Sequence, residues 1–466
     1  MKRGFLNSSK AKRLSTAEAA YVPKDSQAKK VVSNLPTGKV PKVELSEAPK
    51  LKYKESDPLG GSVPGAMTIT TIPIGADDDE PVTECVFVEG SKEVVMAIPN
   101  FPQPMLHPKE VAVRMSPVPG KGMGLLSTRA LKMGDLILSE RPLFICARYV
   151  SKYIPPGYTR EMLAKHDMDE MEQCYGFAVN RMRPADKAAF MALANCHLED
   201  GSGPIVGRVR TNVVRVSGLG PGATDETTEH YGAICRDISR LNHSCSPNTY
   251  QLWDLQSFSF RLHAVRDIAE GEELTFGYMD VLSNAAKRQT GLKPYGFVCT
   301  CASCNDPAAS DPRRAAIKAY SPNVMVWVVD PNLPDDWLIN QCLEQLEILT
   351  TEGLEHNQKY FYVTKAIMEA YICLGDAENT SKWAAKVCKQ VWADEYAREP
   401  TGESAPLMDP KDIEAFEDHD MWRARVDPEN KAVQMFKKFA AMTKPGNIKT
   451  LDGGYSFMTL TRPRNP

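Results

Sequence analysis

Short apolar runs separated by turn residues occupy the middle of the chain. From Val111 onward the runs are rich in Val, Ile, Leu and Phe and are broken by glycine, which is typical of strands joined by tight turns. The predicted strands are 111–115, 124–128, 135–138, 143–146, 210–216, 249–253, 258–265 and 273–278. This pattern predicts a β-rich domain.

Apolar residues at helical spacing interrupt and then follow that domain. Residues 161–197 predict two helices, the second opened by Pro184 at a first-turn position. After about residue 310, amphipathic stretches predict helices at 336–351, 357–374, 379–397 and 428–442. One pair, spanning 366–391, resembles a tetratricopeptide-like hairpin. The expected fold class is α+β, with a helical insert at about 150–200 and a helical C-terminal lobe over 306–466.

The N-terminal region has no sustained periodicity. Residues 1–65 mix Lys, Ser, Pro and Gly with few aromatic side chains, so we expect a disordered tail. Its Lys10–Arg13 cluster is either a solvated basic run or a nuclear-import or nucleic-acid patch. Residues 66–105 contain two β-like runs, 67–72 and 85–89, separated by the acidic turn 77–80. We expect a lead-in segment there rather than a domain.

Composition limits the classes of partner. The 466 residues are 42% hydrophobic and 25% charged with a net charge of −3, so no global field draws the chain to nucleic acid or membrane. The first 60 residues carry 13 Lys/Arg against 6 Asp/Glu, which leaves only weak nucleic-acid contact through the tail. The absence of a long apolar run and of a secretory signal predicts an intracellular protein of the nucleus or cytoplasm.

The cysteines indicate a metal site. Intracellular thiols are kept reduced, so the 12 cysteines are not a disulfide framework. Cys299, Cys301 and Cys304 form a C-x-C-x-x-C group, and a tetrahedral structural zinc needs four ligands. Cys245 is the best candidate for the fourth. The alternative is a reduced cysteine cluster without metal.

The other cysteines in the C-terminal part have a simpler interpretation. Cys342, Cys373 and Cys388 lie at buried-face spacing within predicted helices, so we expect core residues there.

Three further features are ambiguous when each is taken alone. Asn242-His243-Ser244 is not a nucleophilic dyad, because adjacent side chains in an extended turn point apart, and it could simply satisfy backbone groups. Tyr278 taken alone would be a core tyrosine. The Gly120–Gly124 turn is most simply a hairpin; it lacks the G-x-G-x-x-G pattern that opens a helix, which disfavours a Rossmann-type methyltransferase.

Taken in order, these features resemble the SET-domain protein lysine methyltransferases. The matching segments are Gly120–Leu125, Arg240–Asn248, Gly271–Asp280 and Tyr295–Cys304. The resemblance covers roughly 111–305, within an expected SET domain of 106–305 whose post-SET cysteines fall in 295–305. Within the family it is most similar to the SMYD-type split SET proteins. Their MYND finger is absent here, since 147–200 holds only two cysteines, Cys174 and Cys196.

The resemblance implies a role for each matching residue. In that fold the segment 242–248 threads under a loop as a pseudoknot, which would bring Cys245 to Cys299, Cys301 and Cys304 around a structural zinc. Tyr278 would be the catalytic tyrosine, orienting an amine rather than acting as a strong base. The implied S-adenosylmethionine contacts are Lys121, Gly122, Met123, Gly124, Asn212, Asn242, His243, Tyr278 and Phe297.

The implied activity is methyl transfer from S-adenosylmethionine to the ε-amine of a lysine in a protein substrate, histone or non-histone. The helical C-terminal lobe would form one wall of the substrate groove and contact protein partners. Two alternatives remain open. One is a catalytically silent SET scaffold that acts through the helical lobe, and the other is a zinc-stabilised binding domain that uses no cofactor.

Overall fold

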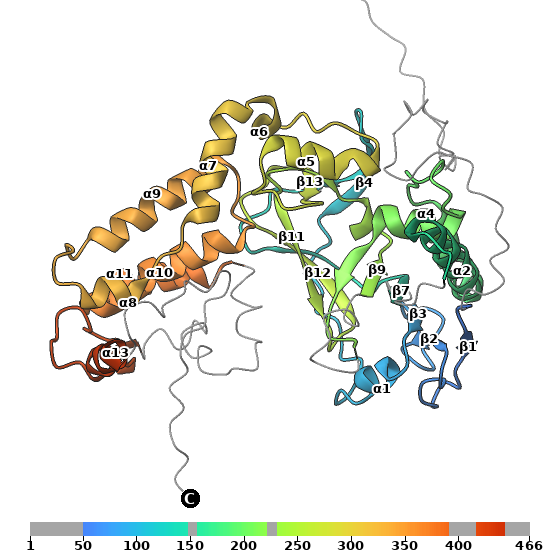
Figure 1. Ribbon diagram of the computed structural model, residues 1–466, viewed down its shortest axis with the longest axis horizontal. Helices are drawn as coiled ribbons and strands as arrows, with labels where there is room; N and C mark the ends of the chain where they lie inside the picture. Colours follow the sequence, from blue (N-terminus) through green and yellow to red (C-terminus); the bar gives the residue numbers. More distant parts are fainter. Residues whose placement is uncertain (1–49, 148–155, 221–230, 391–415, 443–466) are drawn as a thin grey trace, which may run out of the picture.

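A computed structural model describes residues 50–147, 156–220, 231–390 and 416–442 (Figure 1). Three β-sheets form the N-terminal part, and helices form a lobe at the other end of the molecule. The α+β class predicted from the sequence is therefore confirmed. No helix within these described ranges combines the length and the apolar character needed to span a bilayer.

The largest sheet has six strands in the order β1-β2-β3-β7-β9-β8. Its strands are β1 (Tyr53–Glu55), β2 (Met67–Ile72), β3 (Thr83–Phe87), β7 (Phe144–Ala147), β9 (Tyr231–Ile234) and β8 (Val214–Val216). The three central strands β3, β7 and β9 are buried along their whole length, as expected for strands covered on both faces. This sheet is the centre of the main hydrophobic core.

Of the two smaller sheets, the four-stranded one carries three of the four matching segments, on β5, β10 and β13. The four-stranded sheet has the order β10-β13-β5-β4, and the three-stranded sheet has the order β11-β12-β6. Their strands are β4 (Val113–Val118), β5 (Gly122–Ser127), β6 (Leu136–Glu140), β10 (Asn242–His243), β11 (Thr249–Asp254), β12 (Ser259–Ala264) and β13 (Glu273–Phe276). β4 and β5 form an antiparallel hairpin, and β10 pairs in parallel with β13.

The insert between β7 and β8 is helical, as predicted. It contains α2 (Arg160–Arg181), α3 (Pro184–Met191) and α4 (Pro204–Asn212). The side chain of Thr159 caps α2 by accepting from the Met162 amide, and Pro184 occupies the first turn of α3. Tyr175 of α2 packs against Phe144 of β7, so the insert covers the six-stranded sheet.

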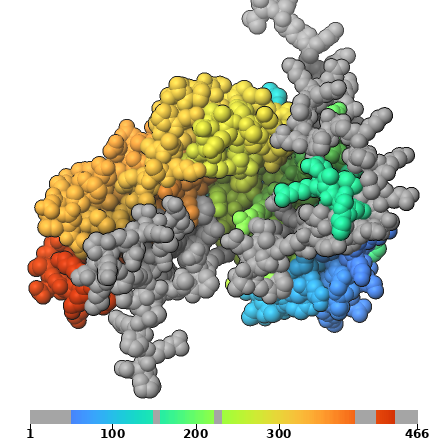
Figure 2. All heavy atoms as spheres, viewed as in Figure 1, coloured from blue at the N-terminus to red at the C-terminus, as the bar shows by residue number. Residues whose placement is uncertain are grey.

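The helical lobe follows the SET-like segment. Its helices are α7 (Pro307–Ala319), α8 (Val324–Val329), α9 (Trp337–Thr351), α10 (Gln358–Leu374), α11 (Ala377–Val387) and α13 (Lys431–Met442). α10 contacts both α9 and α11 and is buried along most of its length. The space-filling view shows the yellow segment that ends in α7 in contact with the orange part of the lobe (Figure 2).

Short elements complete the described chain. They are α1 (Ser91–Met96), α5 (Ala285–Leu292), α6 (Ala302–Asn305) and the 3₁₀ turns η1 (Ile238–Arg240) and η2 (Lys293–Tyr295). α6 carries Cys304 of the predicted cysteine site, and Arg288 of α5 reaches to within 3.7 Å of its sulfur.

The structure corrects the interpretation of the N-terminal region. The predicted lead-in, residues 66–105, contributes β2 and β3 to the main sheet, and β3 pairs in parallel with β7 some 60 residues later in the chain. Within the predicted disordered tail, residues 50–65 include β1, which pairs with β2. The rest of that tail, with the Lys10–Arg13 cluster, lies outside the described residues.

Three further predictions differ in detail. The predicted strand 210–216 is helical as far as Asn212, because Pro204 opens a helix whose buried residues recur at helical spacing, and only 214–216 is extended. β13 ends at Phe276, so Tyr278 lies two residues beyond the strand. Cys342 and Cys373 are core residues as predicted, whereas Cys388 at the end of α11 is only half-buried.

Candidate functional site

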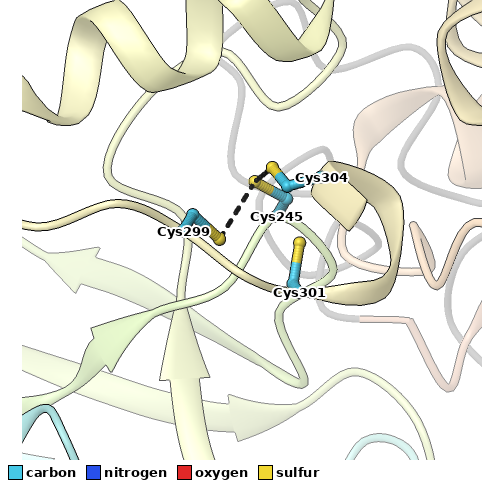
Figure 3. A group of neighbouring side chains, drawn as sticks. All are labelled: Cys245, Cys299, Cys301 and Cys304. Atoms are coloured by element: carbon cyan, nitrogen blue, oxygen red, sulfur yellow. Dashed lines mark hydrogen bonds between the residues drawn. The ribbon is translucent and has the colours of Figure 1, made fainter. Parts of the chain in front are cut away.

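The four predicted metal ligands come together. The sulfur atoms of Cys245, Cys299, Cys301 and Cys304 all lie within 4.8 Å of one another, and Figure 3 shows them facing a common centre. Cys245 follows β10, Cys299 and Cys301 lie on the loop after η2, and Cys304 is on α6. Segments more than 50 residues apart therefore meet at one point, as the pseudoknot expectation requires.

The spacing of the sulfur atoms fits a tetrahedral metal. Cys245 Sγ is 3.9 Å from Cys299 Sγ and 3.6 Å from Cys304 Sγ. A tetrahedron with metal–sulfur distances of about 2.3 Å has sulfur–sulfur distances of about 3.8 Å. The cluster is consistent with zinc.

The ionisation of these thiols gives a second reason for a cation. Hydrogen bonds from Cys245 and Cys299 hold the pKa of Cys301 well below its usual range, while a hydrogen bond to Cys299 and a further one to Cys301 raise the pKa of Cys245. One thiolate can thus form at the expense of its neighbours. A divalent cation would allow all four to ionise together.

A buried arginine also faces the cysteines. Arg288 of α5 is 0% exposed, and its Nη2 lies 3.0 Å from the Ser303 carbonyl and 3.7 Å from Cys304 Sγ. Among the residues that the structure describes, its Nε has no hydrogen-bond partner, and the carboxylate that pairs with it is Asp311, 3.5 Å from Nη1. A buried cation is costly without nearby negative charge. A metal–thiolate cluster would supply that charge.

The predicted cofactor turn contacts Asn242. Asn242 Nδ2 donates to the Met123 carbonyl at 3.3 Å and to Glu273 Oε1 at 2.9 Å. Lys121 Nζ pairs with Glu273 Oε2 at 2.6 Å. A Cβ on Gly124 would lie only 2.7 Å from Asn242 Nδ2, so glycine is needed for this approach. Four predicted residues, Lys121, Met123, Gly124 and Asn242, therefore form one connected group.

Gly122 has a different function from Gly124 in the same turn. Its φ is +77°, a left-handed conformation that favours glycine, and a Cβ there would meet nothing within 4 Å. The hairpin interpretation of this turn is correct, and the turn is also open on the side of Gly122.

Tyr278 is fixed at both its backbone and its hydroxyl group. Its amide donates to His243 Nδ1 at 3.1 Å, and its hydroxyl donates to the Leu241 carbonyl at 2.8 Å. The ring of Tyr295 lies 4.8 Å from that of Tyr278. Burial raises the pKa of the Tyr278 hydroxyl above its usual range, so the hydroxyl stays protonated near neutral pH.

His243 connects the tyrosine to the cysteines. Its ring lies 5.3 Å from that of Tyr278 and 6.1 Å from that of Phe297, and its Nε2 lies 3.3 Å from Cys245 Sγ. Burial lowers the pKa of His243 to about 4, which leaves the imidazole neutral at pH 7. Phe297 is 36% exposed and lies at the outer edge of this group.

Asn212 is placed less directly. It ends α4, and its Nδ2 donates to the carbonyls of Ala194 and Arg208, both at 2.7 Å. Its own carbonyl accepts from Ser239 Oγ at 3.0 Å, three residues before Asn242. The structure therefore joins Asn212 to the chain leading into Asn242 through its backbone, while its side-chain amide binds the insert.

The sequence interpretation missed several residues of this site. Glu273 joins Lys121 to Asn242, Tyr295 stacks near Tyr278, and Arg288 and Arg314 are buried beside the cysteines. Glu273 and Tyr295 lie inside two of the segments that resemble SET domains, and this position is the sequence signal that could have identified them. Nothing in the local sequence marks the two arginines as buried.

Comparison with known proteins identifies the central segment. Residues 122–279 match the SET domain. This match begins in the glycine turn and ends one residue after Tyr278. It therefore includes Asn242, His243 and Cys245, whereas the other three cysteines follow the domain in the manner of a post-SET segment.

Three relatives show how far the similarity extends. Histone-lysine N-methyltransferase set5 of Schizosaccharomyces pombe is 30% identical over 43% of this chain and 53% of its own length. Histone-lysine N-methyltransferase ATXR4 of Arabidopsis thaliana is 30% identical over 32% of this chain and 47% of its own. The chain thus spans about half the length of these curated relatives.

The SMYD-type match is shorter. N-lysine methyltransferase SMYD2-B of Danio rerio is 39% identical, but over only 17% of this chain and 18% of its own length. The SET domain predicted from the motifs is confirmed, and the SMYD-type relation extends over a smaller part of it than the set5 similarity does.

Proposed function

We propose that this protein transfers a methyl group from S-adenosylmethionine to the ε-amine of a lysine in a protein substrate. The observation that carries the proposal is the fixed position of Tyr278, held by His243 and Leu241 beside the Asn242 turn of a SET domain. Two of the relatives, set5 and ATXR4, are named as histone-lysine N-methyltransferases, so histones are the first substrates to test.

The cofactor would lie along the glycine turn. Lys121, Asn242 and the open backbone at Gly122 offer a cation, an amide and free space side by side, which suits the amino-acid part of S-adenosylmethionine. When bound, that cofactor supplies an electrophilic methyl group. The chain's own contribution is to fix the direction from which a lysine can reach it.

The aromatic residues would prepare the lysine. A free lysine has a pKa of about 10.4, so deprotonating it at pH 7 costs about 4.6 kcal/mol. The rings of Tyr278 and Tyr295 lie 4.8 Å apart, and a lysine channel formed by them and Phe297 would disfavour the charged ammonium and lower this cost. The Tyr278 hydroxyl stays protonated and already donates to Leu241, so it would orient the amine and not remove its proton.

The insert supports a split SET arrangement of the SMYD type as the finer assignment. α2 to α4 interrupt the β-rich part between β7 and β8, where they cover the six-stranded sheet. The four cysteines would hold one structural zinc ion that keeps the Asn242–Cys245 turn in place. A histone substrate would imply a nuclear location, and protein partners would be met by the helical lobe.

The test is label transfer from S-adenosylmethionine to core histones, compared between the wild type and Tyr278→Phe. We expect turnover to fall at least ~100-fold, the size of effect seen when a positioned hydroxyl or amide donor is lost. The matched control is Tyr231→Phe, which removes a buried hydroxyl that bonds the Val88 amide and Ser91, far from the site. Its turnover should stay within twofold.

Binding of S-adenosylhomocysteine separates the remaining alternatives. Binding without label transfer to any protein would favour a catalytically silent scaffold. A protein that contains zinc but binds no S-adenosylhomocysteine would instead be a zinc-stabilised binding domain, and the proposed activity would be wrong.

A further inference from the structure

The C-terminal turn of α9 lies against the turn that carries Cys245. Glu352 is the C-cap residue directly after α9, and its carbonyl accepts from Ser246 Oγ at 2.6 Å. The next residue, Gly353, has φ +62°, and a Cβ there would lie 2.9 Å from Ser246 Cβ. The helical lobe therefore contacts the SET region next to a predicted metal ligand, through a glycine that permits the approach.

A buried arginine stabilises this contact between the lobe and the Cys245 turn. Arg314 of α7 is 0% exposed, and its Nη1 donates to the Cys245 carbonyl at 2.9 Å and to the Val281 carbonyl at 2.6 Å. Its Nη2 donates to Ser303 Oγ at 2.7 Å, in the α6 turn between Cys301 and Cys304. One guanidinium thus joins both cysteine-bearing segments to the chain that follows Tyr278.

Glu352 orients that guanidinium. Its Oε2 accepts from Arg314 Nε at 2.8 Å and from Ser310 Oγ at 2.6 Å, and its Oε1 accepts from Arg313 Nε at 2.5 Å. The Glu352 side chain is 1% exposed, so both members of the Arg314–Glu352 pair are desolvated. Loss of Glu352 would leave the buried charge of Arg314 without its carboxylate partner, whereas loss of Arg314 would leave Glu352 paired with Arg313 alone.

The contacts continue from Cys245 to the predicted catalytic residue. Cys245 Sγ lies 3.3 Å from His243 Nε2, and His243 Nδ1 accepts from the Tyr278 amide at 3.1 Å. The lobe, the cysteine cluster and Tyr278 therefore form one contiguous set of contacts.

We propose that Arg314 is a positioning residue: held by Glu352, it sets the Cys245–Ser246 turn, so the helical lobe is required for metal retention and for the Asn242–His243 geometry. The consequence for cofactor binding rests on the proposed function. The consequence for metal retention follows from the four-cysteine cluster and needs no methyl transfer.

The test compares two buried arginines of the full-length protein. Arg314→Lys keeps the charge but loses the fork that reaches the two cysteine-bearing segments. The matched control is Arg425→Lys. Arg425 donates to the Trp327 carbonyl at 2.6 Å and to the Asp330 carbonyl at 2.8 Å, and it pairs with Asp335, all within the lobe. Both changes weaken the lobe, but only the first touches the cysteine turn.

The first measurement is the rate at which a coloured chelator removes zinc from the purified protein. We expect release to be at least ~10-fold faster for Arg314→Lys and within twofold of wild type for Arg425→Lys, at a comparable loss of melting temperature. If Arg314→Lys cannot be purified folded, Ser246→Ala removes only one hydroxyl of the same contact and should accelerate release ~3-fold. Equal release rates in the variants and the wild type, or wild-type protein without metal, would overturn the proposal.

The second measurement is the affinity for S-adenosylhomocysteine, which should fall ~10-fold in Arg314→Lys and stay unchanged in Arg425→Lys. Unchanged affinity in Arg314→Lys would refute the link from the lobe to the cofactor turn. If wild-type protein transfers no methyl group yet shows the expected difference in zinc release, the proposed function fails while the positioning role of Arg314 stands.

Discussion

Two regions support the Asn242–His243 turn, and they do so in different ways. We call the six-stranded sheet the sheet flank and the region around the four cysteines the cysteine flank. On the sheet flank, β3, β7 and β9 are buried throughout, and Phe144 packs edge-on against both Tyr175 and Phe190. On the cysteine flank, the described residues form a small buried cluster of Leu292 and two cysteines, with half-buried side chains such as Tyr278 and Tyr295 packed against it. Arg288 and Arg314 are completely buried beside it.

This difference indicates where the site is robust and where it is fragile. Apolar packing tolerates small shifts, since hydrophobic side chains of similar volume can replace one another at modest cost. A buried polar network stabilises only when every member is satisfied, and a missing partner leaves a desolvated charge. Single substitutions should therefore disrupt the cysteine flank in an all-or-none manner, whereas they should destabilise the sheet flank gradually.

Metal removal should give the largest effect, and it should affect one flank only. Stripping zinc with a strong chelator leaves four thiols that cannot all ionise, next to Arg288 with no strong counter-charge. We expect amide hydrogens of 242–248 and 295–306 to lose protection against exchange by at least ~100-fold, because structural zinc contributes folding free energy outright.

The same exchange experiment contains its control. Amides of β3 and β7 should keep their protection when zinc is removed, because that sheet is closed by apolar packing. Simultaneous loss of protection in both regions would show that the two flanks unfold as one unit, and the contrast between them would be wrong.

Truncation of the sheet flank should give the next largest effect. Phe144→Ala removes a fully buried ring from the centre of the six-stranded sheet, and we expect the free energy of unfolding to fall by about 3–5 kcal/mol. Zinc content, measured by elemental analysis of the folded fraction, should remain at one ion per chain. Loss of zinc at this position would mean that the metal site depends on the sheet.

The sheet flank was the harder of the two to predict from the sequence. The sequence predicts β7 because its residues form a short apolar run, but its parallel partner β3 precedes it by some 60 residues. Local pattern does not encode such a pairing. For the same reason the segment with β2 and β3 was interpreted as a lead-in, although its residues are among the most buried in the chain.

The ligands of the cysteine flank were easier to predict than their supports. The C-x-C-x-x-C spacing identifies Cys299, Cys301 and Cys304 as candidate metal ligands. The order of the motifs along the chain adds Cys245 to them. Arg314 and Glu352 carry no such signal, because charged residues on amphipathic helices normally face water. Only the tertiary structure shows that α7 and α9 turn these two side chains inward, against the Cys245 turn.

The smallest expected effect concerns two carboxylates, one near each flank. Their contributions to the free energy of unfolding should change with pH in opposite directions. Glu140 ends β6 of the three-stranded sheet, shortly before β7 of the sheet flank. It accepts backbone hydrogen bonds from residues 236–238 before Asn242, and burial, reinforced by Asp237, raises its pKa to about 7. Burial alone would also raise the pKa of Glu352, but hydrogen bonds from Ser310, Arg313 and Arg314 hold it below its usual value.

Between about pH 4.5 and 7 the folded protein binds more protons at Glu140 than the unfolded chain, so its contribution to stability falls as pH rises through this window. Glu352 does the reverse, contributing above its unfolded pKa and losing that contribution as pH falls below it. Urea unfolding at pH 5 and pH 7.5 measures this contribution. The loss of unfolding free energy between the two pH values should be about 1–2 kcal/mol smaller in Glu140→Gln than in the wild type, after allowance for partial solvent screening. Glu352→Gln should destabilise at both pH values, and an identical pH profile for the two variants would remove the electrostatic distinction between the flanks.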